Sequence, residues 1–350
     1  MITDRVLIFA PYPYNINGGG PSGFIAHNLL DKPRNLFSLP IDIVKEDRFR
    51  VALNKIIYKV RFHKYDDVDF LFRECGADNF KYIYFHDCLS LYQCSHLIKN
   101  NQVVVLQSHC PELPSEEFKV LYNEPIITAK YVNAERYAFE RADILVFPNE
   151  YAVDIYSDLI KDYTKIKYIL SGAKDMVDPR IYPLDQSKIN ILFVGRRNSI
   201  KGFDYLINTF KSVLLKRDDI NLILVGSGKL YSGRNIFDVG QSNSPQNWFN
   251  SVDYVVNTNL QSYFDLSVIE ALATGVPLIL SNNYGHYYYE GKSKDISTFE
   301  VQKLNGLESI LLGNLMKRDY RDSTNRNLYL DNLTDIAYFE RFEQFCKSII

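Results

Sequence analysis

Two cations and one carboxylate stand where α/β units usually place their ligand-binding atoms. Arg196 and Lys201 follow an apolar run at Ile189–Val194 and precede a helical pattern at Phe203–Lys216. A guanidinium fork and an ammonium group near a helix N-terminus suit a diphosphate. Glu270 lies one turn into a second predicted helix, where its carboxylate could accept hydrogen bonds from both hydroxyls of a ribose. The backbone amides that open this helix, those of Leu266, Ser267 and Val268, would face phosphate.

A glycine loop near the start of the chain offers a second place for an anion or a sugar. Gly18, Gly19 and Gly20 open a predicted helix that runs to about Leu30. Together with Gly23 they fit G-x-G-x-x-G, but Pro11–Asn17 separates them from the preceding strand, so a nicotinamide dinucleotide site is not favoured. A backbone that a phosphate or sugar can approach, and a tight turn without a ligand, both remain open.

Short apolar runs alternate with amphipathic stretches along the chain, which predicts parallel sheets covered by helices. The runs expected to be strands are Arg5–Ala10, Tyr82–Phe85, Val103–Gln107, Ile144–Pro148, Ile189–Val194, Asn221–Val225, Tyr254–Thr258 and Pro277–Leu280. A loop-rich stretch around Pro183–Ser187 divides them into two doubly wound domains, residues 1–184 and 185–335. The final helix, 336–350, is left free to pack back on the first domain. Ligands of such sheets bind at the carboxyl ends of the strands, and we expect the two domains to face one another across a cleft.

Composition excludes several classes of protein. The 350 residues include 40 Lys plus Arg and 42 Asp plus Glu, so no overall positive field attracts nucleic acid. Five cysteines without a Cys-x-x-Cys pair argue against a disulfide framework or a zinc site. No apolar run reaches the roughly 18 residues of a membrane span, and the first run is too short for a signal peptide. We therefore expect a cytoplasmic protein.

Several short motifs follow one another in the second half of the chain. They are Gly195-Arg196, Lys201-Gly202, Val225-Gly226-Ser227-Gly228, Glu270-Ala271-Leu272-Ala273 and Gly275-Val276-Pro277. In this order they resemble the C-terminal half of the family 4 glycosyltransferases (glycosyl transferases group 1), which have the GT-B fold of two Rossmann-like domains. The strong resemblance covers roughly residues 189–290.

The resemblance implies a role for each matching residue. Gly195, Gly226 and the helix amides would line the donor site, Arg196 and Lys201 would hold the diphosphate, and Glu270 would bind the ribose. Val239 and Gly240 match the strand end that contacts the base. In the first half, Tyr84-Phe85-His86-Asp87 and the strand that ends at His109 resemble histidine-containing strand ends of the family, and His109 would act near the reacting anomeric carbon.

One departure bears on the donor sugar. The family's Glu-x7-Glu pattern places a glutamate eight residues before Glu270, where this sequence has Ser262. The family's Gly-Phe-Gly between the two reads Tyr263-Phe264-Asp265. Since the first glutamate usually contacts the sugar, Ser262 and Asp265 indicate either an unusual donor or an impaired enzyme.

Two charged segments have more than one functional interpretation. Asp67-Val68-Asp69 fits an Asp-x-Asp metal motif, but no nucleotide-binding pattern surrounds it, so we expect no metal. Arg48–Lys64 carries six Lys or Arg and no acid among interleaved apolar residues. It could be a basic amphipathic helix on an anionic membrane surface or a domain helix with a solvated basic face.

Together these observations predict a retaining glycosyltransferase that needs no cofactor. It would move a sugar from a UDP-sugar or GDP-sugar to a saccharide or lipid-linked acceptor, in bacterial surface polysaccharide or lipopolysaccharide biosynthesis. It would work in the cytoplasm, with a peripheral position at the inner face of the membrane as a further option. A sugar-nucleotide epimerase of the same fold and a degenerate, non-catalytic partner subunit are the alternatives.

Overall fold

A computed structural model describes residues 3–44, 66–122, 124–176, 182–242, 244–303, 305–319 and 323–350. The chain forms two compact units. The first unit comprises Met1–Pro148, Tyr156–Ile169 and Phe339–Ile350, and the second comprises Asn149–Ile155 and Leu170–Tyr338. From the sequence we expected the boundary after residue 184. The structural division assigns residues 170–184 to the second unit instead. The basic stretch Arg48–Lys64 lies outside the described residues.

The first unit contains a parallel six-stranded sheet in the order β2-β1-β3-β4-β5-β6. Its strands are β1 (Thr3–Phe9), β2 (Phe37–Ser38), β3 (Phe80–Phe85), β4 (Val103–Leu106), β5 (Ile144–Phe147) and β6 (Ile166–Tyr168). Its helices are α1 (Gly20–Asn28), α2 (Pro40–Val44), α4 (Asp67–Glu74), α5 (Cys88–Gln93), α6 (Pro114–Tyr122) and α7 (Pro125–Arg141).

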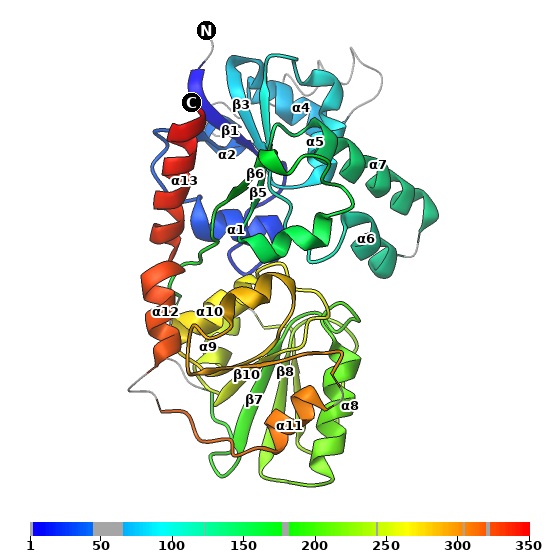
Figure 1. Ribbon diagram of the computed structural model, residues 1–350, viewed down its shortest axis with the longest axis vertical. Helices are drawn as coiled ribbons and strands as arrows, with labels where there is room; N and C mark the ends of the chain where they lie inside the picture. The colour runs from blue at the N-terminus through cyan, green and yellow to red at the C-terminus, as the bar shows by residue number, and fades with distance from the viewer. Residues whose placement is uncertain are drawn as a thin grey trace. The chain divides into compact units, whose positions relative to one another are not determined.

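The C-terminal helix α13 (Asp335–Ile349) runs beside this first sheet (Figure 1). Phe342 meets Phe37 of β2 edge to face at a ring separation of 5.6 Å, and Phe345 meets Tyr84 of β3 at 6.1 Å. Such buried aromatic pairs fix the helix on the sheet. Residues Phe339–Ile350 therefore belong to the first unit.

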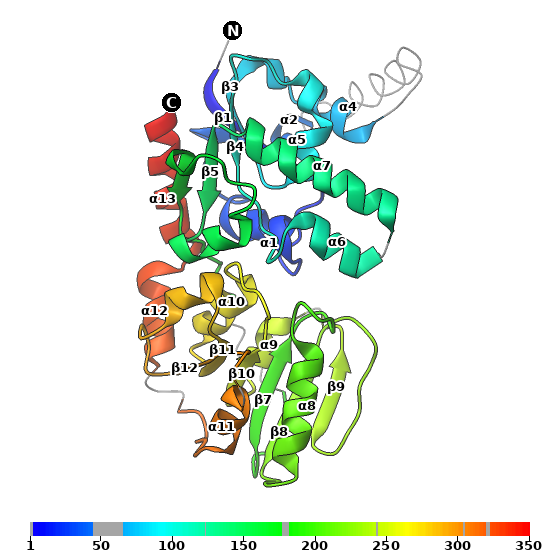
Figure 2. The same cartoon turned by 45° about the vertical axis from the view of Figure 1, so that its right-hand side comes forward.

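The second unit contains another parallel six-stranded sheet, in the order β12-β11-β10-β7-β8-β9. Its strands are β7 (Ile189–Val194), β8 (Ile220–Val225), β9 (Ile236–Gly240), β10 (Tyr254–Asn257), β11 (Leu278–Ser281) and β12 (Ile296–Phe299). Its helices are α8 (Phe203–Leu214), α9 (Pro245–Phe249), α10 (Leu266–Thr274), α11 (Gly306–Leu312) and α12 (Thr324–Asn332). Figure 2 shows α8 over the sheet and β9 at its edge beside β8.

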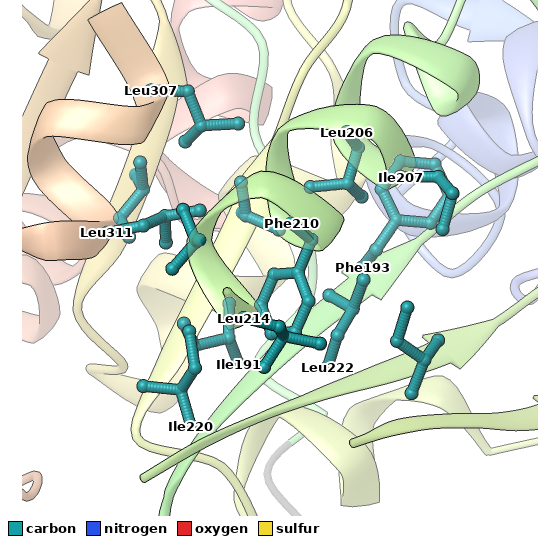
Figure 3. Close-up of a cluster of buried hydrophobic side chains, with 14 of the residues drawn as sticks. Ile191, Phe193, Leu206, Ile207, Phe210, Leu214, Ile220, Leu222, Leu307 and Leu311 are labelled. Atoms are coloured by element: carbon teal, nitrogen blue, oxygen red, sulfur yellow. The ribbon is translucent and has the colours of Figure 1, made fainter. Parts of the chain in front are cut away.

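Helix α8 forms because its apolar residues recur at helical spacing and share one buried face. That face consists of Phe203, Leu206, Ile207, Phe210, Val213 and Leu214. Figure 3 shows four of them, Leu206, Ile207, Phe210 and Leu214, packed with residues of β7 and β8 and with Leu307 and Leu311 of α11. This cluster fixes α8 on β7, and thus sets the position of the loop between them, which carries the predicted diphosphate residues.

Every apolar run expected to be a strand is one, and the alternation with helices yields the expected two parallel sheets. Among the described residues, none of the helices combines the length and apolar character that a membrane crossing requires.

Candidate functional site

Lys201 is held at the carboxyl edge of the second sheet by the glycine that follows it. Gly202 has a left-handed backbone (φ +62°), and a Cβ placed there would come within 2.0 Å of the carbonyl oxygen of Thr258. The Thr258 hydroxyl in turn donates to the Lys201 carbonyl at 2.9 Å. The Lys-Gly pair therefore lets the β7–α8 loop lie directly on the end of β10.

The ammonium group of Lys201 ends in a polar cluster around Asp265. Its Nζ is 2.5 Å from Asp265 Oδ1, and the two side chains are 16% and 12% exposed. Asp265 Oδ2 accepts from Asn259 Nδ2 at 2.8 Å and lies 3.1 Å from Nε2 of the buried His286. Asp265 is also the N-cap residue of α10. Lys201 is therefore fixed at the start of that helix.

The same neighbours keep Asp265 ionised. Burial by itself raises the pKa of this carboxyl group, but the charge of Lys201 and the contacts with His286 outweigh it and hold the pKa below its usual range. Asn259 and His286 were not identified from the sequence, because their roles depend on the ends of β10 and β11 meeting α10.

Helix α10 presents its first amides beside this cluster. The Val268 amide donates to the Asp265 carbonyl at 3.1 Å, so it begins the helical hydrogen bonding. The amides of Leu266 and Ser267 precede it, in the turn where helix N–H groups have no partner within the helix. With the Lys201 ammonium group they form a set of donors suited to an anion. Glu270 lies one turn further on and is partly buried.

Ser262 is fully buried, and its hydroxyl has no hydrogen-bond partner among the described residues. Its carbonyl accepts from the Gly285 amide at 2.9 Å, which joins the β10–α10 loop to the segment after β11. The Ser262 side chain therefore faces protein on all sides.

The two neighbouring arginines after β7 differ in their surroundings. Arg196 is exposed. The side chain of Arg197 is buried, and its Nη2 lies 2.5 Å from Asp238 Oδ1, with the two side chains 2% and 6% exposed. Its Nη1 also donates to the Gly226 carbonyl at 2.9 Å. Arg197 thus joins the ends of β7, β8 and β9, a structural role that the sequence reasoning missed.

The glycines at these strand ends allow close backbone contact. A Cβ on Gly226 would lie 2.0 Å from the Gly195 carbonyl oxygen, so the loops after β7 and β8 touch through their main chains. Gly240 ends β9 with a left-handed backbone (φ +75°) and donates its amide to Asp238 Oδ1 at 2.8 Å. Val239 before it is 42% exposed, and its side chain is open to a ligand.

His109 lies in the first unit, beyond the end of β4. Its Nε2 is 2.9 Å from Nδ1 of His86, which follows β3, and the ring of Phe24 lies 4.5 Å from its own. Burial lowers the pKa of His109 to about 3, so the ring is neutral near pH 7.

Phe24 belongs to α1, the helix that the glycine loop opens. Gly19 caps α1, and Gly20 begins it with a left-handed backbone (φ +61°). The Gly18 amide donates to the Asn15 carbonyl at 2.8 Å, which makes the loop a tight turn. No side chain would collide with a Cβ at Gly19 or Gly20, so the loop surface is open there.

Across the described ranges, no group of three His, Cys, Asp or Glu side chains has the arrangement of a metal site. Asp67 and Asp69 lie in the first turn of α4, where Asp66 caps the helix and Asp69 contacts His96 at 3.1 Å.

The cations and helix amides lie at the carboxyl edge of a parallel α/β sheet, which is the edge where sheets of this kind bind their ligands. Residues 188–299 match the family of glycosyl transferases group 1, so the resemblance read from the sequence motifs is confirmed there.

Curated relatives are distant. An uncharacterized 41.2 kDa protein in the cps region of Klebsiella pneumoniae is 26% identical over 43% of this chain and 46% of its own length. An uncharacterized glycosyltransferase of Methanocaldococcus jannaschii is 23% identical over 59% of each chain. The matches thus span about half the length of these relatives.

Solved structures match nearly the whole chain. Sucrose-phosphate synthase from Thermosynechococcus elongatus gives a TM-score of 0.64 at 15% identity, over 99% of this chain and 98% of that one. Anabaena HepE in complex with UDP and glucose gives 0.63 at 13% identity, over 98% and 99%. The two six-stranded parallel sheets and their helices are those of the GT-B fold, as predicted.

Proposed function

We propose that the protein is a retaining glycosyltransferase that moves a sugar from a UDP-sugar or GDP-sugar to an acceptor hydroxyl. The observation that carries the proposal is the Lys201 ammonium group fixed beside the first amides of α10, with Glu270 one turn further along the helix. Donors arranged in advance at one point stabilise the charge that grows on a departing diphosphate. The UDP and glucose bound to HepE support a donor of this chemistry.

Each residue then has a defined role. Lys201 and Arg196 hold the diphosphate, the amides of Leu266 and Ser267 add hydrogen bonds, and Glu270 accepts from the ribose hydroxyls. The departing phosphate itself takes the proton of the acceptor hydroxyl as the new bond forms on the same face of the sugar. His109 orients the sugar near its anomeric carbon.

The acceptor that we propose is a saccharide or lipid-linked saccharide of a bacterial surface polysaccharide or lipopolysaccharide. The match to a protein in the cps region of Klebsiella pneumoniae supports it. We propose further that the protein works in the cytoplasm and contacts an anionic membrane through Arg48–Lys64. These residues lie outside the described ranges.

A thermal-shift panel of UDP, GDP, ADP, CMP and their sugars tests the donor site. A ligand at 100 times its dissociation constant stabilises the protein by about 2.7 kcal/mol, and this shift identifies the base. With the donor known, Lys201→Ala should lower turnover by about 100-fold or more, the scale for removing one donor from an oxyanion site. Lys211→Ala, an exposed lysine on α8, is the matched control.

The outcomes separate the alternatives. Sugar transfer that depends on Lys201 supports the proposal. Isomerisation of the free nucleotide sugar without an acceptor would indicate an epimerase. Nucleotide binding without any turnover would indicate a non-catalytic partner subunit, and the absence of binding to every nucleotide in the panel would reject the donor site itself.

A further inference from the structure

Two buried histidines of the first unit are bonded directly to one another. Strands β3 and β4 are neighbours in parallel register, with Phe85 opposite Leu106. His86 directly follows β3, and His109 lies three residues beyond the end of β4. This places His86 Nδ1 2.9 Å from His109 Nε2, with the two ring planes inclined by 22°.

Neither ring carries a charge near neutral pH. Burial lowers the pKa of His86 well below its usual range, and the neighbouring His109 lowers it further. Burial alone lowers the pKa of His109 to about 3. The contact between them therefore contains one proton, and it belongs either to Nδ1 of His86 or to Nε2 of His109.

The surroundings of His86 decide between the two arrangements. His86 is fully buried against the rings of Tyr84 and Phe24, at centroid separations of 4.9 Å and 5.7 Å. Its Nε2 has no hydrogen-bond partner among the described residues. If His109 were the donor, neutral His86 would carry its proton on Nε2 and bury an N–H group without an acceptor. Unpaired buried N–H groups are rarer than unpaired acceptors.

We infer that His86 donates its Nδ1–H to His109 Nε2 and thereby fixes the proton of His109 on Nδ1. His86 is a positioning residue, because it acts through His109. The Nε2 lone pair of His109 accepts this hydrogen bond, so the ring of His109 carries its N–H group at Nδ1 and keeps no lone pair available as a proton acceptor. His109 can then orient an oxygen of the ligand but cannot serve as a general base.

The identity of that ligand as a sugar rests on the proposed function, whereas the proton position does not. A donating His109 agrees with a reaction in which the departing phosphate, and no side chain, removes the acceptor proton. It excludes a reaction in which His109 takes that proton.

Nuclear magnetic resonance tests the proton position on the full chain. Long-range proton–nitrogen correlation of 15N-histidine-labelled protein near pH 7 distinguishes protonated from unprotonated ring nitrogens. The spectra of His86→Asn and His109→Gln assign the two rings among the six histidines. We expect a protonated Nδ1 and an unprotonated Nε2 on His109. A protonated Nε2 on His109, alone or with Nδ1, would overturn the inference.

Two substitutions test the positioning role. His86→Asn keeps an amide donor where Nδ1 stands and should retain kcat within a few-fold. His86→Leu removes the donor and should lower kcat by about 10- to 100-fold, the scale seen when the partner that orients a metal-binding histidine is lost. KM for the donor sugar should change less than kcat. His96→Leu, an exposed histidine of the same unit, is the control.

These readouts separate the inference from the proposed function. Without transfer activity towards any donor, the proposed function fails while the tautomer measured by resonance still decides the inference. If transfer occurs and His86→Asn and His86→Leu lose kcat equally while both stay folded, the positioning role is wrong.

Discussion

Arg197 and Arg196 are adjacent in sequence, yet their substitution should have opposite consequences. Arg197 is inserted between three strand ends, where it pairs with Asp238 at 2.5 Å and donates to the Gly226 carbonyl. Asp238 in turn accepts from the Tyr231 amide at 2.7 Å. Truncation of Arg197 leaves the Asp238 carboxylate buried without its counter-charge.

The magnitude follows from burial. Removal of one partner from a buried ion pair costs about 3–5 kcal/mol, because the remaining charge is neither hydrated nor paired. In a unit of this size that corresponds to a fall in Tm of about 6–20 °C. Arg196→Ala removes an exposed side chain and should change stability by no more than about 0.5 kcal/mol.

The assay can be confined to the unit concerned. The chain has one tryptophan, Trp248 of α9, which is buried in the second unit against the ring of Tyr182. Its fluorescence during urea or thermal unfolding therefore reports this unit. Arg197→Ala should shift the transition strongly and Arg196→Ala should not. Equal shifts for the two variants would refute the assignment of Arg197 to structure and Arg196 to the ligand.

Three further predictions concern binding, acid stability and metal. Glu270→Gln should weaken the binding of the bare nucleoside diphosphate by about 1.5–3 kcal/mol in calorimetric titration. Ser262→Ala should leave that affinity unchanged, because Ser262 is fully buried. Equal affinities of Glu270→Gln and the unmodified protein would reject the ribose contact. His109 has a pKa of about 3 when folded against an ordinary 6.5, so below pH 6.5 the unfolded chain binds a proton that the native protein does not. Stability should therefore fall by up to about 1.4 kcal/mol per pH unit from this residue as pH drops from 6.5 towards 3, and urea titrations of His109→Gln should show a shallower decline; an unchanged slope would contradict the buried neutral ring. EDTA should leave sugar transfer intact if cations of the protein and helix amides neutralise the diphosphate, and a strict requirement for added Mn²⁺ would show otherwise.

The sequence predicted the central strands and missed those at the edges. The strands not expected from apolar runs are β2, β6, β9 and β12, and these are the edge strands of the two sheets. A central strand of a parallel sheet is covered on both faces and reads as a continuous apolar run. An edge strand is short or half-exposed, as in β9, where buried Ile236 is followed by exposed Phe237. An edge strand is defined by its pairing with a neighbouring strand, and the local sequence pattern does not contain that information.

The candidate site, like the sheets, could be predicted only in part from the sequence. The motif Lys201-Gly202 marks a cation next to a left-handed glycine, and the structure explains this pair through the contact with Thr258. The partners of the cation were not predictable. Asn259 and His286 reach Asp265 from the segments that follow β10 and β11, and only the sheet order brings these segments together.

Asp265 shows how the site can differ from the family pattern and still hold its cation. The family has glycine at this position, and here a carboxylate stands 2.5 Å from Lys201 Nζ. An ammonium group has three N–H donors, and Asp265 occupies one of them, so two remain for a diphosphate. Because Lys201 and His286 hold the pKa of Asp265 below its usual range despite burial, the carboxylate stays ionised from mildly acidic to alkaline pH. The orientation of Lys201 should therefore stay the same over that range, so the proposed diphosphate would approach a cation that is already in place.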